Sequence, residues 1–369
     1  MSHDANLAID TADRAMEVRP EHALDEVRLA AFLAEHLPAG DGSGSLSLAQ
    51  FDAGQSNPTY LVTFAGRRYV LRKKPPGKLL PSAHAVDREF RIMQALADTQ
   101  VPVPSLRVLC DDDSIIGTMF YVMDFIEGRV FKDPALPALP TGDRSRVFET
   151  AARTLASLHR VDWRAAGLED YGKSQDYIAR QIHRWSGQYE ASKTEEIPAM
   201  DQLTRWLSDN MPADVNDPGN VTIAHGDFRI DNMIYSPDSL DPIAVLDWEL
   251  STIGHPLSDF AYCAMMYFIP AKAQPTLGLA GLNLAEHGLP SLSEFVAMYA
   301  DAARRSDIGA MNYYMAFSKF RMAAILQGVY KRSLDGNASS RVAGQVGEFV
   351  KTFAKAGLMF SDGTFRVDD

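Results

Sequence analysis

The sequence has few cysteines, no long apolar run and no excess of positive charge, and each shortage excludes a class of protein. Two cysteines in 369 residues cannot build a disulfide framework, which favours a reducing compartment. The longest apolar run, FAYCAMMYFIP (260–270), is about half as long as a membrane span needs to be. The net charge of −12 argues against general nucleic-acid binding, which requires a basic surface to meet the phosphates.

The first 22 residues, MSHDANLAIDTADRAMEVRPEH, lack the apolar core of a secretion signal. We therefore predict a cytoplasmic enzyme or binding protein, with no nucleic-acid or membrane partner. The hydrophobic fraction of 46% and the charged fraction of 23% are ordinary for a globular protein. The length allows two lobes, whereas the oligomeric state is not encoded in any pattern that we recognise.

The hydrophobic pattern divides the chain into three parts. Residues 1–20 are polar and aperiodic, which predicts a flexible tail. Residues 21–127 are rich in strand patterns and predict an N-terminal nucleotide-binding lobe. Residues 128–369 are mostly helical, with a short β island at 221–248, and predict a C-terminal catalytic and substrate lobe. The expected fold class is α+β, with a small antiparallel-sheet lobe and a larger, mostly helical lobe.

The β island contains a short polar stretch, HGDFRIDN (225–232), directly after the apolar lead VTIA. We expect the adjacent strand ends to bring Asp227, Asn232 and Asp247 into one cleft. Amide and carboxylate oxygens suit Mg²⁺, which takes few protein ligands and shares its shell with phosphates and water. A further carboxylate can accept a proton from a hydroxyl nucleophile. This combination predicts phosphoryl transfer.

The spacing His-x-Asp-x-x-x-x-Asn, followed 15 residues later by an Asp at the end of an apolar run, is typical of kinase-like folds. With SNPTYLV, YVLRKKPPG, DREFRIMQAL and FYVMDFIEG, the chain resembles the aminoglycoside and choline phosphotransferase family from about residue 25 onward. The stretches LRKKPPG and WELSTIGHPLSDFAY are most similar to the phosphotransferase group related to the kinase-like region of acyl-CoA dehydrogenase fusions. The resemblance implies a bilobal, protein-kinase-like fold that uses ATP and Mg²⁺.

The resemblance also implies a role for each matching residue of the C-terminal lobe. Asp227 would be the base that orients the acceptor hydroxyl. Asn232 and Asp247 would hold Mg²⁺. Arg229 stands where protein kinases keep a catalytic-loop lysine, two residues after the aspartate, and would meet the γ-phosphate.

In the N-terminal lobe the resemblance implies a nucleotide site. Arg72 stands at the position of the strand lysine that pairs the α- and β-phosphates, and Glu89 at the position of its helix partner. Ser56 and Asn57 belong to the nucleotide loop, and Met123 belongs to the hinge, so all three are expected to contact the nucleotide.

Several residues depart from the family pattern or allow a simpler interpretation. Arg72 replaces the usual lysine, and Lys74 on the same strand face is an alternative phosphate ligand. His225 and Asp259 are interpreted as residues that shape loops rather than as catalysts, and Glu249 either approaches a second metal or packs. The segment GLEDYGKS (167–174) matches a phosphate-loop pattern, but it follows a helix instead of a strand and contains two acids, so we interpret it as structural.

The leading functional hypothesis is an ATP- and Mg²⁺-dependent kinase that moves the γ-phosphate to a hydroxyl of a small molecule, with a hydroxyacyl-CoA or a similar metabolite favoured by the resemblance. One alternative is an aminoglycoside or choline-type kinase. Another is a nucleotide-binding regulator without catalysis, although all the expected catalytic residues are present. A metal-dependent phosphohydrolase would need further histidine ligands. The sequence does not distinguish ATP from GTP as the donor.

Overall fold

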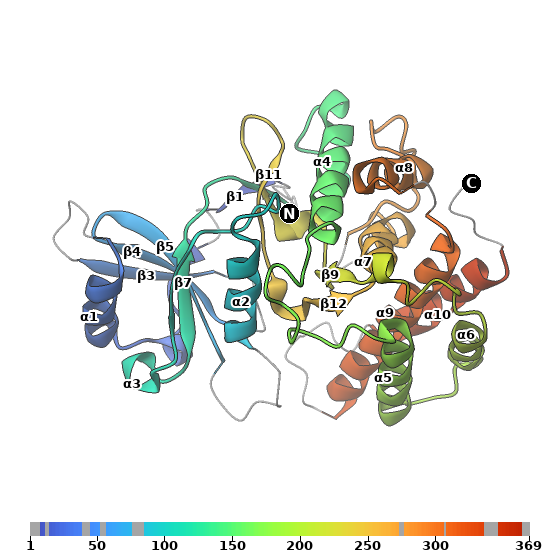
Figure 1. Cartoon of the computed structure of the whole chain (residues 1–369), viewed down its shortest axis with the longest axis horizontal. Helices are drawn as coiled ribbons and strands as arrows, with labels where there is room; N and C mark the ends of the chain where they lie inside the picture. The colour runs from blue at the N-terminus through green and yellow to red at the C-terminus, as the bar shows by residue number, and fades with distance from the viewer. Residues whose placement is uncertain are drawn as a thin grey trace, which may run out of the picture. The chain divides into compact units, whose positions relative to one another are not determined.

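The computed structural model divides the chain into two compact units (Figure 1). Unit 1 consists of Met1–Lys132 and Arg229–Ser251, and unit 2 consists of Asp133–Phe228 and Thr252–Asp369. This division differs from the predicted one at residue 127, because the first unit extends to Lys132 and also includes 229–251. The structure describes residues 8–11, 15–38, 45–51, 57–75, 85–272, 277–305, 308–335 and 346–363.

Unit 1 is built on a six-stranded antiparallel sheet. In spatial order its strands are β2 (Ala15–Met16), β3 (Leu46–Phe51), β4 (Thr59–Phe64), β5 (Arg67–Lys73), β7 (Phe120–Asp124) and β6 (Leu106–Cys110). Strands β4 and β5 form an antiparallel hairpin. Its turn residues Ala65 and Gly66 have φ angles of 50° and 77°, the positive values that a tight two-residue hairpin loop requires.

The two long helices of unit 1 pack on opposite faces of this sheet. Helix α1 (Glu26–His36) buries Leu29 and Leu33 in a cluster that includes Leu71 of β5. Helix α2 (Val86–Leu96) contacts β6 and β7, and its Phe90 ring packs edge-on against Tyr121. Because side chains alternate along a strand, Arg72 lies on the face opposite Leu71, toward α2. A short helix, α3 (Asp113–Ile116), contacts α1.

A second sheet in unit 1 has the strand order β1 (Ala8–Asp10), β8 (Arg129–Phe131), β10 (Met233–Tyr235) and β11 (Pro242–Val245). Within the stretch predicted as a tail, residues 8–10 and 15–16 form strands, and β1 pairs with β8 and β2 with β3. Thr11 is buried, and its hydroxyl donates to the carbonyl of Ile126 at 2.9 Å. Strands of two or three residues are too short to show an alternating pattern, so these strands could not be predicted from the sequence.

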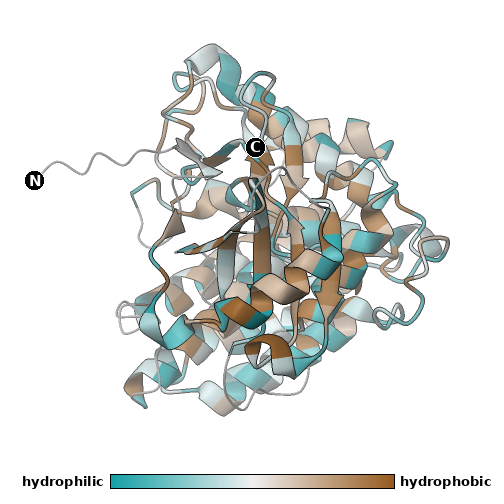
Figure 2. Ribbon diagram, turned by 90° about the vertical axis from the view of Figure 1, so that its left-hand side faces the viewer, coloured by the Kyte–Doolittle hydropathy of each residue, from teal (hydrophilic) through white to brown (hydrophobic). Residues whose placement is uncertain are grey.

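Unit 2 is mostly helical, with one small two-stranded sheet. Its elements are α4 (Thr141–His159), α5 (Tyr177–Ser192), α6 (Pro198–Asp209), β9 (Thr222–Ala224), β12 (Thr252–Gly254), α7 (Pro256–Cys263), α8 (Leu292–Ala303), α9 (Met311–Leu334) and α10 (Gly347–Ser361). Helix α9 contacts α5, α6, α7 and α10, and apolar side chains on most of its sides account for this central position. Figure 2 shows helices on which hydrophilic and hydrophobic residues lie side by side, as expected of helices with one buried face.

The segment GLEDYGKS lies in the connection between α4 and α5. Leu168 and Tyr171 of this segment are buried, and a Cβ atom on Gly172 would come within 2.6 Å of the Thr252 hydroxyl. The glycine therefore permits close packing, which supports the structural interpretation. Among the described residues, no helix combines the length and the apolar character needed to cross a lipid bilayer.

Candidate active site

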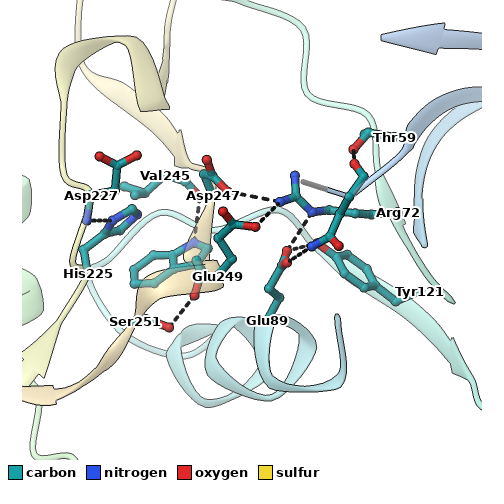
Figure 3. Close-up of polar contacts among 12 residues, drawn as sticks. Thr59, Arg72, Glu89, Tyr121, His225, Asp227, Val245, Asp247, Glu249 and Ser251 are labelled. Atoms are coloured by element: carbon teal, nitrogen blue, oxygen red, sulfur yellow. Dashed lines mark hydrogen bonds and ion pairs between the residues drawn. The ribbon is translucent and has the colours of Figure 1, made fainter. Parts of the chain in front are cut away.

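Unit 1 brings one arginine and three carboxylates together (Figure 3). The Nε atom of Arg72 lies 2.8 Å from Glu89 Oε2, and its Nη2 atom lies 3.0 Å from Asp247 Oδ1. Glu249 Oε2 is 3.6 Å from the same Nη2 atom. The Nε contact is an ion pair without hydrogen-bond geometry, whereas Nη2 donates a hydrogen bond to Asp247. Strand β5, helix α2 and the segment after β11 each contribute to the cluster.

Burial makes this cluster electrostatically strong. The side chain of Arg72 is 11% exposed and that of Glu89 only 2%. Burial alone would lower the pKa of Arg72, but the charges of Glu89, Tyr121, Asp247 and Glu249 outweigh burial and raise it. Burial raises the pKa of Glu89, and the charge of Arg72 opposes part of that rise. The guanidinium therefore favours the ionised form of a carboxylate whose burial favours the neutral form.

Two neutral side chains of unit 1 hydrogen-bond to Glu89. The Asn57 side-chain amide donates to Glu89 Oε1 at 2.8 Å, and the Tyr121 hydroxyl donates to Oε2 at 3.1 Å. Asn57 is fully buried, and its Oδ1 atom has no hydrogen-bond partner. Sequence reasoning assigned Asn57 to the nucleotide, and the structure shows that it also fixes the partner of Arg72. The role of Tyr121 gave no signal in the sequence.

The other predicted nucleotide residues occupy different surroundings. The Lys74 ammonium lies 3.3 Å from Asp87 Oδ1 in a partly exposed ion pair. Met123 is buried on β7, where it pairs with Val70 in register. Ser56 lies outside the described residues. Lys74 therefore has its own acid, and Arg72 is the basic residue that contacts Glu89.

The two predicted metal ligands, Asn232 and Asp247, lie at the open end of the β10–β11 hairpin. Met233 pairs with Val245, so Asn232 and Asp247 lie just beyond the last paired residues, and the Leu246 amide donates to the Asn232 carbonyl at 2.9 Å. Asp247 has a φ angle of 65°, a left-handed conformation that aspartate and asparagine tolerate better than other side chains. The Trp248 indole then donates to the Val245 carbonyl at 2.9 Å, which fixes the turn that carries Asp247.

Arg229 was predicted to meet the γ-phosphate. In the structure it belongs to unit 1, and its Nε atom donates to Asp231 Oδ1 at 2.9 Å. The fork of the guanidinium also contacts the second oxygen of that carboxylate. This local pair orients the side chain, and the phosphate contact stays a prediction.

Unit 2 holds the loop that carries Asp227. His225 follows β9 directly, and the Asp227 amide donates to His225 Nδ1 at 3.3 Å. Asp259 at the start of α7 accepts hydrogen bonds from the His225 and Gly226 amides at 2.6 and 2.8 Å. The interpretations of His225 and Asp259 as residues that shape this loop are therefore supported. Gly226 has a φ angle of 84°, which favours glycine at this turn.

Asp259 is held in turn by residues that the sequence did not reveal. It is almost fully buried, and His159 Nε2 of α4 lies 3.3 Å from its Oδ2 atom. Burial would raise the pKa of Asp259, but the hydrogen bond and charge of His159, the charge of His225 and the Gly226 amide outweigh burial and lower it. The ring nitrogen His159 Nδ1 lies 2.6 Å from the Tyr299 hydroxyl of α8. The loop before Asp227 is thus tied to three helices of unit 2.

Replacing Arg72 by methionine is expected to destabilise the protein by about 3–5 kcal/mol, because it leaves the buried Glu89 without its partner. The deficit should grow as the pH rises from about 4 to 7, since the folded variant then retains a proton on Glu89 that the unfolded chain releases. Urea unfolding at pH 5 and pH 7.5 measures both effects.

The matched control for this change is Arg68→Met on the same strand. Arg68 pairs with Glu127 at 2.9 Å, but both side chains are exposed, so we expect a loss of about 1 kcal/mol or less. Equal destabilisation by the two variants, or no dependence of the Arg72→Met deficit on pH, would contradict the assigned role of Arg72.

Comparisons with known proteins show which family the chain resembles in sequence and in fold. A model of the phosphotransferase enzyme family matches residues 47–302. Acyl-CoA dehydrogenase family member 10 of Mus musculus is 45% identical over 342 residues, which are 93% of this chain and 31% of that protein. A crystal structure from Ralstonia eutropha JMP134, assigned as an aminoglycoside phosphotransferase, is 42% identical with a TM-score of 0.83 and covers 92% of this chain and 99% of its own.

A more distant structure shows how far the fold extends. A thermostable mutant of an aminoglycoside phosphotransferase, in a ternary complex with AMP-PNP and hygromycin B, has a TM-score of 0.57 at 16% identity and covers 91% of this chain and 99% of its own. That likeness concerns the fold alone. The chain spans less than half the length of the curated relatives that it matches.

These matches confirm the predicted kinase-like α+β fold and the predicted resemblance to the kinase-like region of acyl-CoA dehydrogenase fusions. The family model covers more than half of the chain, and the Ralstonia eutropha structure is matched over nearly its whole length. The chain therefore belongs to the phosphotransferase enzyme family, and it is a small-molecule kinase.

Proposed function

We propose that the protein is an ATP- and Mg²⁺-dependent kinase that transfers the γ-phosphate to a hydroxyl of a small metabolite. The observation that carries the proposal is the contact of Arg72 with both Glu89 and Asp247. A buried acid fixes a guanidinium, and that guanidinium lies beside a carboxylate suited to a metal. Phosphoryl transfer needs this combination of a phosphate clamp and a metal ligand.

The residues at the end of the β10–β11 hairpin fit Mg²⁺. Asn232 and Asp247 offer an amide oxygen and a carboxylate, the hard oxygen ligands that this ion prefers. Among the described residues no group of three or more His, Cys, Asp or Glu is arranged to hold a metal. A site with two protein ligands suits an ion that retains waters and binds phosphate oxygens. The bound ion would neutralise charge on the nucleotide phosphates.

The remaining chemistry falls to side chains of this chain. We assign Asp227 to orient the acceptor hydroxyl and to accept its proton as the phosphate is transferred. The two amides that Asp259 holds keep the backbone before Asp227 in place. Arg72 is assigned to the α- and β-phosphates, and Arg229 to the γ-phosphate. A planar guanidinium suits both contacts, because it binds phosphate oxygens in pairs.

For the acceptor we favour a hydroxyacyl-CoA or a similar hydroxylated metabolite. The support is the 45% identity to a protein named as a member of the acyl-CoA dehydrogenase family, in which the matched region forms less than a third of the chain. An aminoglycoside is the second candidate, because the Ralstonia eutropha structure at 42% identity is assigned to that class.

The test is phosphate transfer from ATP, with and without Mg²⁺, to a panel of hydroxyacyl-CoAs, aminoglycosides, choline and amino-alcohols. We expect transfer to the hydroxyacyl-CoAs, dependent on Mg²⁺ and absent in the Asp227→Ala variant. Transfer to aminoglycosides alone would replace the favoured acceptor by the second candidate. ATP binding without transfer to any member of the panel would favour the non-catalytic regulator.

A further inference from the structure

Arg321 of α9 is a buried cation next to the loop that carries Asp227. Its side chain lies in unit 2, the residue is 8% exposed, and its Nη2 atom donates to the Gly226 carbonyl at 3.1 Å. The guanidinium lies over the rings of Tyr262 and Trp185, with centroid distances of 5.1 and 5.7 Å. Its Nε atom is buried and has no hydrogen-bond partner. The protein therefore satisfies this guanidinium only in part.

A buried charge is normally paired with an opposite charge, because its desolvation is costly. Arg321 forms no ion pair with any carboxylate in the part of the chain that the structure describes. This is unexpected in a protein with 48 acidic and 36 basic residues. A bound anion beside Arg321 would supply the missing partner.

Helix α5 packs against α9, the helix of Arg321, and it carries two more arginines, Arg180 and Arg184. Tyr177, Arg180 and Arg184 are spaced i, i+3 and i+7, which places them on one side of that helix. Arg180 donates to the Lys173 carbonyl, and Arg184 lies over the Trp185 ring that Arg321 also contacts. Neither forms an ion pair with a carboxylate among the described residues.

The Tyr177 ring is buried and lies against β12. A Cβ atom on Gly254 of β12 would lie 3.1 Å from its Cζ atom, so the phenol end reaches the strand next to β9. Burial raises the pKa of Tyr177. The charge of Arg321 opposes that rise, the charge of Asp259 adds to it, and the charges of Arg180 and Arg184 oppose it. The three guanidinium groups are therefore within electrostatic reach of one buried phenol.

We propose that Arg321, Arg180 and Arg184 bind an anionic group of the acceptor, a phosphate or a carboxylate distinct from the hydroxyl that is phosphorylated. This inference rests on the proposed function, because it concerns the same acceptor. The fork of a guanidinium matches both anions. Since Arg321 contacts Gly226, the residue before Asp227, an anion held here would fix the acceptor within the same unit as the proposed base.

The experiment measures binding without turnover. The full chain is saturated with ADP and Mg²⁺ to occupy the nucleotide site, and butyryl-CoA or butyrate is titrated by calorimetry. Butyryl-CoA tests phosphate as the anion, and butyrate tests carboxylate. We expect one of them to bind, and Arg321→Gln and Arg184→Gln each to raise its Kd about tenfold or more. Arg205→Gln on α6, which also removes an exposed helical arginine, should change the Kd less than about twofold.

Three outcomes would overturn the proposal. The first is the absence of binding of both probes to the wild type. The second is an equal Kd for the Arg184→Gln, Arg321→Gln and Arg205→Gln variants. If Arg321→Gln fails to fold, the comparison of Arg184→Gln with Arg205→Gln still decides this point. The third is an unchanged Kd in Arg321→Gln together with a lower kcat in a separate phosphate-transfer assay. That result would assign Arg321 to holding the loop. Binding that depends on the arginines without any phosphate transfer would uphold this site and reject the proposed function.

Discussion

Replacing Asp227 by asparagine is expected to lower kcat for phosphate transfer by about 10²- to 10⁴-fold, the range over which a positioned base accelerates proton transfer. Asparagine has the same shape but cannot accept the proton of the acceptor hydroxyl. The hydrogen bonds that hold the loop involve the His225 and Gly226 amides and Asp259, so the loop itself should remain in place. The Kd for ADP should therefore stay within about twofold of the wild-type value.

The kinetics of this variant are compared with those of Asp238→Asn, which removes an exposed acid in the connection between β10 and β11. That control should transfer phosphate at the wild-type rate. A kcat for Asp227→Asn within about twofold of the wild type would contradict the assignment of the base. A simultaneous loss of ADP binding would point to a general structural defect, which circular dichroism and urea unfolding would detect.

Replacing Lys319 by methionine is expected to stabilise the protein by about 1–4 kcal/mol near pH 7, as hydrophobic replacements of buried charges often do. Lys319 lies on α9 with no solvent exposure, and its Nζ atom has no hydrogen-bond partner. The rings of Phe268 and Phe353 lie 4.5 and 5.2 Å from that atom. These rings offset only part of the cost of removing an ammonium group from water.

The stabilisation should depend on pH in a defined direction. Burial lowers the pKa of Lys319 to about 7, whereas a lysine in an unfolded chain titrates near 10.4. Between these values the unfolded chain binds a proton that the folded protein does not, so the stability of the wild type rises with pH. The gain from Lys319→Met should therefore be largest at and below pH 7 and should decline toward pH 10.

Chemical unfolding of both proteins at pH 6, 8 and 9.5 measures this change. Lys355→Met is the matched control, because Lys355 is exposed on α10, the helix that packs against α9. It should alter the free energy of unfolding by about 0.5 kcal/mol or less at every pH. A Lys319→Met variant that is less stable than the wild type at pH 6 would show that the ammonium group has a favourable partner.

The sequence predicted the parts of the molecule in which local pattern and chemistry agree. The β4–β5 hairpin has strand-forming residues around a glycine turn, and helix α2 has apolar residues at helical spacing, so the local pattern of each favours the observed element. Arg72 and Glu89 could be paired because each occupies a position that the family motif defines. Their separation of 2.8 Å agrees with that expectation.

The contacts that the sequence did not reveal join residues far apart in the chain. Asp259 lies 34 positions after His225, and Arg321 lies 95 positions after Gly226. Arg321 belongs to α9, a helix that is apolar on most of its sides. From the sequence alone, an arginine in such a helix is normally predicted to be exposed. Neither spacing nor periodicity carries information about such pairs, because they depend on which helices pack together.

The bond between α7 and the loop at His225 changes how related sequences should be judged. A chain can retain the whole His-Gly-Asp motif and still lack an acid at the position of Asp259, and two buried backbone amides would then have no acceptor. Such a chain would have the expected catalytic residues on a loop that had lost the acceptor of two of its amides. When inactive members of the family are sorted from active ones, the aspartate 34 residues downstream should therefore be examined together with the motif.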